Sequence, residues 1–541
     1  MNYRPQRLSA LFCVVVTGII VHTFFLDLSW QHVAQCVSMA FDNAIRPMWY
    51  SAKAASSSYP PSIAWIACPS SDLPALECGQ LRVPMNHDEP EGGGSITLGL
   101  VRLKASAEGR PLGNLIVNPG GPGVSEVSKF VQNSQGELVS HSLTSVYNII
   151  AMDPRGVGAS SAIQCDAESF NERIPGYMTN TTDIGRLASW NRALAWTCAN
   201  LTGALFHYLD TVSVARDLDL LRRALGDKRL NFMGFSYGTQ LGSQYAELFP
   251  ERVGRMVLDG ILDHSQHEFD ALITEASAFE DTFTSVAEWC NTTTECALYK
   301  RDILSIFDET VEKANKNPIP APGCHELKGI HLADTAAAAC RLDVTGYEII
   351  ETSQDLLSKK SQWPAWSKAL LEAILGNATA LSSPVATSNV IPMTESFNPF
   401  AHRAITCQDW LHPTGPRAGK AFLAMLRATR ALAPHTRGIS EMAGIQAGCI
   451  GWPVPVRNPQ RQLRRDRLEK APPIMLVNAL HDPSTSVIWA IRLRQQMPTA
   501  VSIFRRGFGH TSYREYGETQ KVMDDYLLHG KMVADLTTLD S

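Results

Sequence analysis

The sequence predicts an α/β protein with a mostly parallel sheet, covered by helices on both faces, and an inserted helical segment. Apolar strands alternate with amphipathic helices between residues 114 and 260, which is typical of parallel strands joined by helical crossovers. Strand patterns return only near residues 473 and 500, after a long stretch of helical periodicity. At 541 residues, with 45% hydrophobic and 19% charged, the chain can form a large core plus an inserted unit.

The N-terminus carries a targeting signal. Arg4 and Arg7 precede an apolar run over residues 8–28. Its length lies between the ~7–15 residues of a signal-peptide core and the ~20 of a spanning helix, and closer to the latter. We therefore expect residues 1–30 to be a signal-anchor, with a cleaved signal peptide as the alternative. The uncleaved segment would attach the chain to a membrane, with the remainder in the lumen or outside the cell.

Other features agree with export into an oxidising compartment. Ten of the twelve cysteines form five couples that are close in sequence, and four Asn-x-Ser/Thr sequons fit a glycoprotein of the secretory pathway. The couples are Cys68/Cys78, Cys165/Cys198, Cys290/Cys296, Cys324/Cys340 and Cys407/Cys449, and the sequons begin at Asn180, Asn200, Asn291 and Asn377. The net charge of −5 gives no reason to expect a nucleic-acid partner, and no Cys/His spacing suggests a metal site.

Composition and periodicity also divide the chain. A Ser- and Pro-containing linker is expected after the N-terminal segment, and the long helical stretch is expected as a cap inserted into the sheet domain. The expected boundaries are 31–64 for the linker, 65–263 for the first part of the core, 264–455 for the cap, and 456–541 for the C-terminal part of the core.

The first elements of the core are strands. Residues 77–84 and 95–101 are predicted as antiparallel strands joined by a glycine-rich turn. An apolar strand at 114–118 then runs directly into a loop that contains Gly120 and Gly121. Glycines let backbone N–H groups approach a developing oxyanion, so the sequence predicts an oxyanion hole here. A glycine-rich turn or phosphate loop is the alternative, but the Lys-Ser/Thr pair of a P-loop is missing.

The next elements complete the approach to a candidate nucleophile. A buried strand at 147–152 ends in a turn, where Asp153 and Arg155 are expected to hold the strand end through an ion pair rather than to act in catalysis. Residues 209–226 are predicted as an amphipathic helix with a glycine at its end. The apolar strand 230–234 follows.

This strand leads into a Gly-x-Ser-x-Gly motif centred on Ser236. In a nucleophile elbow, the serine lies on a strained strand-to-helix turn that the flanking Gly234 and Gly238 make possible. The pattern is short enough to occur by chance, so it needs partners elsewhere in the chain. The backbone N–H of Tyr237 is the second predicted oxyanion donor.

The partners follow the last two predicted strands. Asp482 comes after the strand 473–478, and His510 comes after the strand 500–504. Carboxyl ends of parallel strands meet at one edge of a sheet, so these loops can lie together. The order Ser236, Asp482, His510 is that of the α/β-hydrolase triad.

Two neighbouring residues compete for these roles. Asp259 also stands at a predicted strand end, over residues 255–260, and is the alternative acid. His481 precedes Asp482 on an extended segment, so its side chain points elsewhere, and we expect it at the rim of the site.

Together these motifs resemble the tripeptidyl-aminopeptidase-like branch of the prolyl iminopeptidase group of α/β-hydrolases. The resemblance covers about residue 65 to the end. It rests on Asn-Pro-Gly-Gly-Pro-Gly at 118–123, Asp-Pro-Arg-Gly-Val-Gly at 153–158, Gly-Phe-Ser-Tyr-Gly-Thr at 234–239, Val-Leu-Asp-Gly at 257–260, Asp482-Pro483 and Gly509-His510.

The resemblance implies a secreted or membrane-bound serine exopeptidase that acts at peptide N-termini without a metal or cofactor. The chain departs from it at Asn118-Pro119, where iminopeptidases commonly have a histidine before the glycines, and the cap has no transferable motif. Similar fungal chains also act on small-molecule esters or lactones. A peptide or a small ester is therefore the expected substrate, and an inactive binding ectodomain is the remaining alternative.

Overall fold

The computed structural model describes most of the chain beyond the expected linker. The described residues are 62–540 apart from 69–74, 108, 133–138, 175, 326–338, 393–394 and 416. The expected signal-anchor at 1–30 and nearly all of the expected linker lie outside these residues, so both stay predictions. Within the described ranges, no helix combines the length and apolarity that a membrane span requires.

A ten-stranded sheet forms the centre of the fold, and its strand order is β1-β2-β3-β5-β4-β6-β7-β10-β11-β12. The strands from β5 onward in this order pair in parallel, whereas the three at the other end pair antiparallel. The predicted α/β fold class is thereby confirmed. The strands are β1 (Ala64–Ala67), β2 (Leu76–Pro84), β3 (Ser95–Leu103), β4 (Gly113–Asn118), β5 (Tyr147–Met152), β6 (Leu230–Phe235), β7 (Val253–Asp259), β10 (Met475–His481), β11 (Val501–Phe508) and β12 (Thr537–Asp540).

Both faces of the sheet are apolar because successive side chains of a strand point in opposite directions. In β6, Phe232 packs on one face with Leu241 of α8, and Met233 packs on the other face with Leu527 of α18. One face is covered by α7 (Thr211–Ala224), α8 (Tyr237–Leu248) and α17 (Val487–Gln496), and the other by α3 (Glu126–Gln132), α4 (His141–Val146) and α18 (Glu518–His529).

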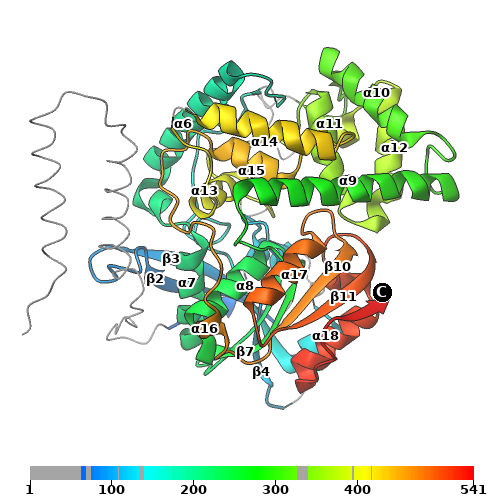
Figure 1. Ribbon diagram of the computed structural model, residues 1–541. Helices are drawn as coiled ribbons and strands as arrows, with labels where there is room; N and C mark the ends of the chain where they lie inside the picture. The colour runs from blue at the N-terminus through cyan, green and yellow to red at the C-terminus, as the bar shows by residue number, and fades with distance from the viewer. Residues whose placement is uncertain are drawn as a thin grey trace, which may run out of the picture. The chain divides into compact units, whose positions relative to one another are not determined.

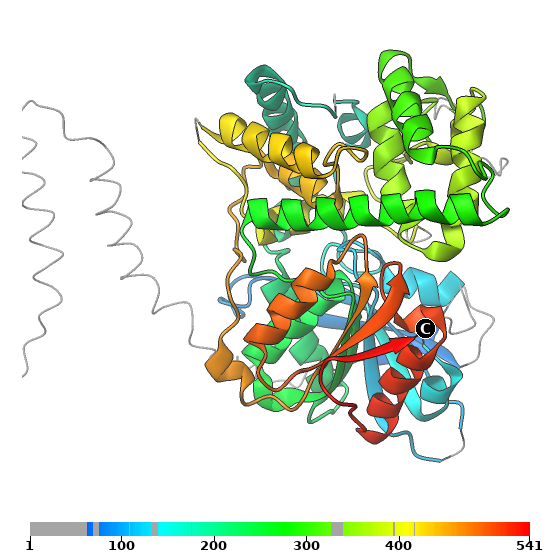
Figure 2. The same ribbon diagram turned by 45° about the vertical axis from the view of Figure 1, so that its right-hand side comes forward.

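A second layer of helices lies over one edge of the sheet domain, and we call it the cap (Figures 1 and 2). Its long helix α9 contacts α10, α11, α14 and α15, and it also touches β10. The main cap helices are α9 (Glu268–Thr292), α10 (Ile303–Lys316), α11 (Gly346–Leu357), α12 (Trp363–Ile374), α13 (Pro399–Asp409), α14 (Ala418–Leu432) and α15 (Glu441–Cys449).

An earlier part of the chain joins the cap layer. Helix α6 (Thr181–Thr202) packs against α14 and α15, as Figure 1 shows, although it lies between β5 and β6 in sequence. The shorter elements are α5 (Ala167–Asn171), α16 (Arg465–Leu468), the strand pair β8 (Ile319–Pro320) and β9 (Asp343–Val344), and the 3-10 turns η2 (Gly203–His207), η3 (Pro250–Arg252), η4 (Lys360–Gln362), η5 (Thr379–Leu381) and η6 (Tyr513–Glu515).

Five disulfides join the five cysteine couples expected from the sequence. Cys407–Cys449 ties α13 to α15, and Cys290–Cys296 closes the turn after α9. All four sequon asparagines are exposed, and each lies in or beside a helix of the cap layer. These features indicate a protein of the secretory pathway or the cell exterior.

Candidate active site

The turn at Ser236 has the geometry of a nucleophile elbow. Ser236 lies between β6 and α8 with φ 54° and ψ −123°, which is a strained conformation for a residue with a side chain. A Cβ atom on Gly238 would lie 2.7 Å from the Asn118 side-chain oxygen. The motif therefore needs its glycine for close packing as well as for the turn.

The glycine-rich loop lies directly beside this serine. A Cβ atom on Gly120 would come within 2.8 Å of the Ser236 Cβ and 3.3 Å of the Tyr237 nitrogen. The Gly120 N–H donates to Asn118 Oδ1 at 3.1 Å. Because Gly120 is engaged in this way, Gly121 and Tyr237 are the better candidates for oxyanion donors.

His510 and Asp482 form a close pair. His510 Nδ1 lies 3.0 Å from both carboxylate oxygens of Asp482. The carboxylate also accepts the Ser484, Thr485 and Thr511 N–H groups at 2.8–3.1 Å.

Both pKa values of this pair shift toward the charged forms. Burial alone would raise the pKa of Asp482, but His510 and the backbone donors hold it below its ordinary value. Burial alone would lower the pKa of His510, but Asp482 raises it above its ordinary value. This arrangement would orient the imidazole and stabilise its protonated form.

Ser236 and the His510–Asp482 pair have neighbouring residues in common. Ser236 and Thr485 line one cavity, and the Thr485 hydroxyl lies 3.2 Å from His510 Nδ1. A Cβ atom on Gly260 would lie 3.3 Å from His510 Cε1. Gly260, which directly follows β7, thus lies next to the imidazole, and a side chain at this position would crowd the ring.

Asp259, the alternative acid, has other partners. Its carboxylate accepts the N–H groups of Ser512 and Tyr513 at 2.8–3.0 Å, and its carbonyl accepts the Ser236 N–H at 3.0 Å. Burial raises the pKa of Asp259 to about 6 against these donors. Asp259 therefore connects the elbow to the loop that follows His510.

The other sequence candidates lie around the site. His481 contacts Asp281 of α9 through Nδ1 at 2.8 Å and stacks on Phe508. Arg155 is fully buried, but its ion pair is with Asp217 of α7, at 2.7 Å, rather than with Asp153. The expected pairing within this turn was wrong, because Asp153 accepts hydrogen bonds from the Ser125 hydroxyl and the Val127 and Ala159 N–H groups instead.

The cap supplies two carboxyl groups that sequence motifs did not reveal. We call the cavity beside Ser236 the catalytic cavity; its volume is about 20 Å³, close to the space of one water molecule. Glu275 of α9 and Glu441 of α15 both line it. The remaining lining residues are Gly121, Pro122, Ser236, Tyr237, Gln240, Leu262, Thr406, Asp409, Trp410, Met442, Ile445, Ser484, Thr485 and Trp489.

These two carboxyl groups influence each other and the histidine. Burial, followed by the proximity of Glu441, raises the pKa of Glu275 well above its ordinary value, and Glu275 also accepts the Met442 N–H at 2.6 Å. Burial and then Asp355 raise the pKa of Glu441 to about 7, while His510 opposes the rise. A cation in the cavity would relieve both groups.

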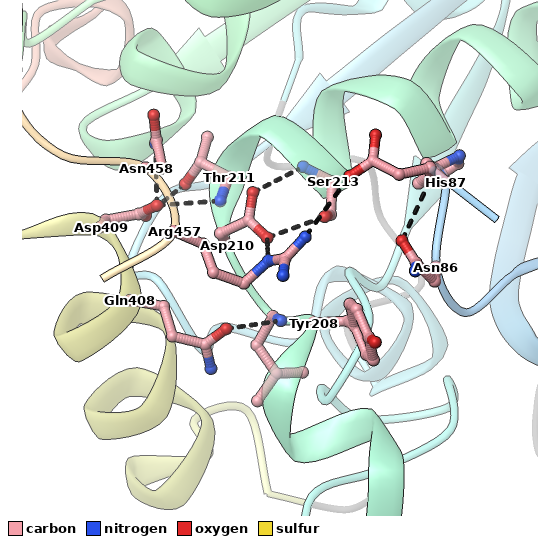
Figure 3. A network of polar contacts seen from close by, with 12 residues as sticks. Asn86, His87, Tyr208, Asp210, Thr211, Ser213, Gln408, Asp409, Arg457 and Asn458 are labelled. Carbon is pink, nitrogen blue, oxygen red and sulfur yellow. Dashed lines mark hydrogen bonds and ion pairs between the residues drawn. The ribbon is translucent and has the colours of Figure 1, made fainter. Parts of the chain in front are cut away.

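A buried polar network supports the cavity from the side of the core (Figure 3). Asp409 at the end of α13 accepts the Thr211 N–H at 2.9 Å and the Asn458 side-chain amide at 2.8 Å. The Thr211 hydroxyl lies 2.6 Å from the Tyr237 hydroxyl. The network thereby joins the cap to α7 and fixes the residue that begins α8.

Within the described ranges, no group of three or more His, Cys, Asp or Glu side chains has the arrangement of a metal site.

Comparison with known proteins gives two matching family models. The α/β hydrolase fold model matches residues 113–318, and the TAP-like protein model matches residues 439–538. The two matches contain the positions of Ser236, Asp482 and His510.

Curated relatives match over most of their length. The chain is 28% identical over 507 residues to serine protease Hip1 of Mycobacterium tuberculosis, covering 90% of this chain and 92% of that one. It is 27% identical to the tripeptidyl aminopeptidase of Streptomyces lividans, covering 87% and 85%, and to carboxylesterase B of M. tuberculosis, covering 84% and 85%. A solved proline iminopeptidase of Mycobacterium smegmatis aligns with a TM-score of 0.31 at 12% identity, over 83% of this chain and 97% of that one.

Proposed function

This chain belongs to the TAP-like family of α/β-hydrolases, and on that premise we propose that it is a serine exopeptidase that acts at peptide N-termini. Its similarity to a serine protease, to a tripeptidyl aminopeptidase and to the α/β hydrolase fold model supports its assignment as an α/β-hydrolase enzyme. It would release single residues or short peptides through an acyl-enzyme. The observation that carries the exopeptidase proposal is the pair Glu275 and Glu441 in the same cavity as Ser236.

The proposed chemistry begins with attack of Ser236 Oγ on the scissile carbonyl carbon. His510 takes the serine proton and then gives it to the leaving amine as the C–N bond breaks. Water repeats the sequence on the acyl-enzyme and releases the acid. Asp482 holds the imidazole through Nδ1, and the N–H groups of Gly121 and Tyr237 would bind the oxyanion, where loss of one donor typically costs ~10²–10³ in rate.

The two cap carboxyl groups would recognise a protonated α-amine. They lie close to each other in a small cavity whose other lining includes Leu262, Met442 and Ile445. Carboxyl groups held together in such a place are destabilised as anions, and a bound ammonium group reverses this. An N-terminal amine would supply that charge and place the first peptide bonds next to Ser236.

The test compares free and acetylated N-termini. We expect wild-type protein to hydrolyse aminoacyl or peptidyl anilides at least about 100-fold faster than the same substrates with an acetylated amine, because the acetyl group removes the charge. Glu441→Gln should remove most of this difference. Glu309→Gln, which changes an exposed carboxyl group of α10, is the matched control. Equal rates with both wild-type substrates would contradict the exopeptidase proposal.

Mass spectrometry of the products from a peptide mixture would give the length of the fragment released. The Ser236→Ala protein is the control, and it should show no turnover while remaining folded. Wild-type-like activity in Ser236→Ala or His510→Ala would refute the proposed triad.

An esterase or lactonase acting on a small molecule is the second candidate, and the similarity to carboxylesterase B favours it. The same serine chemistry would apply. A panel of aryl esters and peptide anilides separates the two, since hydrolysis of esters alone would exclude the peptidase.

The remaining candidate is an inactive binding ectodomain. A fluorophosphonate probe should label wild-type protein at Ser236, and folded protein that resists the probe would favour this candidate. We further propose that the N-terminal apolar segment directs the catalytic domain to the lumen or exterior.

A further inference from the structure

Two buried polar side chains in the catalytic cavity have hydrogen-bonding atoms without a partner among the described residues. They are the Oε1 atom of Gln240 and the Nε1 atom of Trp489. Each side chain is only about 1% exposed. Buried polar atoms are normally paired because leaving them unpaired is costly, so the cavity offers one unused acceptor and one unused donor.

Several neighbouring polar groups of the cavity already have hydrogen-bond partners. The Thr485 hydroxyl donates to Asp482 at 2.9 Å, and the Thr406 hydroxyl donates to the His402 carbonyl at 2.8 Å. Asp409 accepts from Thr211 and Asn458, as Figure 3 shows. Among the described residues, Gln240 Oε1 and Trp489 Nε1 are the buried side-chain atoms of the cavity lining that lack a partner.

The orientation of the Gln240 amide follows from Asp409. The Gln240 Nε2 group donates to Asp409 Oδ2 at 3.4 Å. With the nitrogen facing Asp409, Oε1 is the end of the amide without a partner. The fixed amide makes Gln240 an acceptor toward a ligand.

The position of Gln240 relative to Ser236 identifies the part of the substrate it meets. Gln240 lies on the first turn of α8, four residues after Ser236, and both residues line the catalytic cavity. Trp489 approaches the same cavity from α17, which follows the loop of Asp482. Because Ser236, Gln240 and Trp489 line one cavity, the residue acylated on Ser236 would lie beside both groups.

We propose that Gln240 and Trp489 select a substrate whose acyl residue carries a small hydroxyl group, of the serine or threonine class. The hydroxyl would donate to Gln240 Oε1 and accept from the Trp489 Nε1–H group. A carboxamide could make both bonds too, but a cavity of about 20 Å³ favours the smaller group. The inference rests on the proposed acyl transfer to Ser236 and names the substrate class of that site.

Isosteric substrate pairs test the inference directly. Threonyl and valyl anilides differ by a hydroxyl in place of a methyl group, so they have nearly the same volume. A site built to bond a substrate hydroxyl rejects an analogue that lacks it, by up to ~10⁴-fold or more. We expect kcat/KM for the threonyl substrate to exceed that for the valyl substrate at least about tenfold. Aryl esters of 3-hydroxybutanoate and 3-methylbutanoate provide the same comparison without an amine.

Conservative variants assign the preference to the two side chains. Gln240→Met and Trp489→Phe keep volume but remove the acceptor and the donor, and each should reduce the threonyl-to-valyl ratio at least about fivefold. Trp452→Phe and Gln446→Met are matched controls, because Trp452 Nε1 and Gln446 Oε1 are also buried and unpartnered but do not line the catalytic cavity. The controls should keep the wild-type ratio.

Several outcomes would overturn the inference. They are a wild-type ratio of one or less for both substrate pairs, an unchanged ratio in both Gln240→Met and Trp489→Phe, or an equal loss in the controls. Failure of the proposed function has a different signature, namely no fluorophosphonate labelling and no turnover of any pair. In that case, calorimetric binding of threonine amide and valine amide to the Ser236→Ala protein still decides the inference: equal affinities would reject it, and preferential binding of threonine amide would support it.

Discussion

At the scale of the residue, the site depends on carboxyl groups that do different work in similar surroundings. Asp482 is bonded to His510, Asp259 to the backbone after His510, and Glu275 to the start of α15. The pKa of Asp482 is lowered, whereas burial raises those of Asp259 and Glu275. Of the three, only the carboxyl group beside the imidazole has a pKa held below its ordinary value.

Asp259→Asn should impair catalysis without abolishing folding. The amide accepts one N–H group but opposes the other with its own N–H₂, so the loop after His510 loses part of its support. We expect kcat to fall about 10–100-fold with KM nearly unchanged, since small misplacements of catalytic groups have effects of that size. Asp259 also contributes to the raised pKa of His510, so the acid limb of the kcat profile should move to lower pH.

The control is Asp263→Asn, which changes another buried carboxyl group of the following segment that contacts Arg492 instead. An Asp259→Asn enzyme with wild-type kcat and an unmoved pH profile would show that this bridge plays no part in positioning His510.

The pH dependence of activity should differ between substrates with and without an amine. His510 must be neutral to take the serine proton, and its pKa is raised, so kcat/KM falls as pH decreases through that value. Glu441 has a pKa of about 7, so it also becomes protonated and loses its charge as the pH decreases along this acid limb. For a free amine, two groups then titrate and the acid limb should be steeper than for an aryl ester.

Measurement of kcat/KM from about pH 5 to pH 9 checks this. In Glu441→Gln, the limb for the amine substrate should become as shallow as that for the ester. Identical limbs for both substrates in the wild type would exclude a role of Glu441 in amine binding.

At the scale of the element, the strand ends and helix starts hold the site together. Arg155, at the end of β5, reaches Asp217 of α7 in a fully buried ion pair and also donates to the carbonyls of Pro84, Met85 and Tyr208. One guanidinium group thereby joins β2, β5 and α7 behind the elbow.

Asp217→Ala should destabilise the protein strongly, because it leaves a buried cation without its carboxylate. Such a change typically costs about 3–5 kcal/mol. Thermal and urea unfolding would measure it, with Asp88→Ala as the control, whose surface pair with Arg216 is worth about 0–1 kcal/mol. Similar losses in the free energy of unfolding in the two variants would contradict a larger contribution of the buried pair to stability.

The sequence predicted the elements of the core well because the signals for these elements are local in sequence. Alternation between apolar strands and amphipathic helices, and glycines at turns, depend on neighbours in sequence. Residues 230–234, for example, were predicted as a strand and form part of β6, and 209–226 were predicted as a helix that contains α7. The motif around Ser236 predicted its strained turn for the same reason.

The parts that could not be predicted depend on packing between distant segments. Glu275 and Glu441 lie on the cap helices α9 and α15, and nothing in their local sequence separates them from surface glutamates. The local sequence around Trp489 likewise does not indicate that this residue lines the cavity. The pairing of Arg155 with Asp217 rather than Asp153 is likewise set by the approach of α7. These residues acquire their roles only where segments far apart in sequence pack together.

At the scale of the whole molecule, the cap is tied together covalently. The disulfide Cys407–Cys449 closes a long loop between α13 and α15, and α15 carries Glu441. The cysteines of Cys290–Cys296 are separated by only six positions. The two bonds should therefore differ in their contribution to stability.

Replacing Cys407 and Cys449 together with serine should cost about 4 kcal/mol, against about 2 kcal/mol for Cys290 and Cys296, because a longer loop loses more entropy on closure. Unfolding of the purified variants under non-reducing conditions would compare them. A larger loss from the short loop would show that local strain or packing, rather than loop length, governs these bonds.

The location of the sequons has a consequence for what can reach the enzyme. Asn180, Asn200, Asn291 and Asn377 all project from the cap layer rather than from the outer helices of the sheet domain. Carbohydrate attached there would surround the layer that covers Ser236. It would exclude folded proteins from the site by steric hindrance and still admit flexible chain termini.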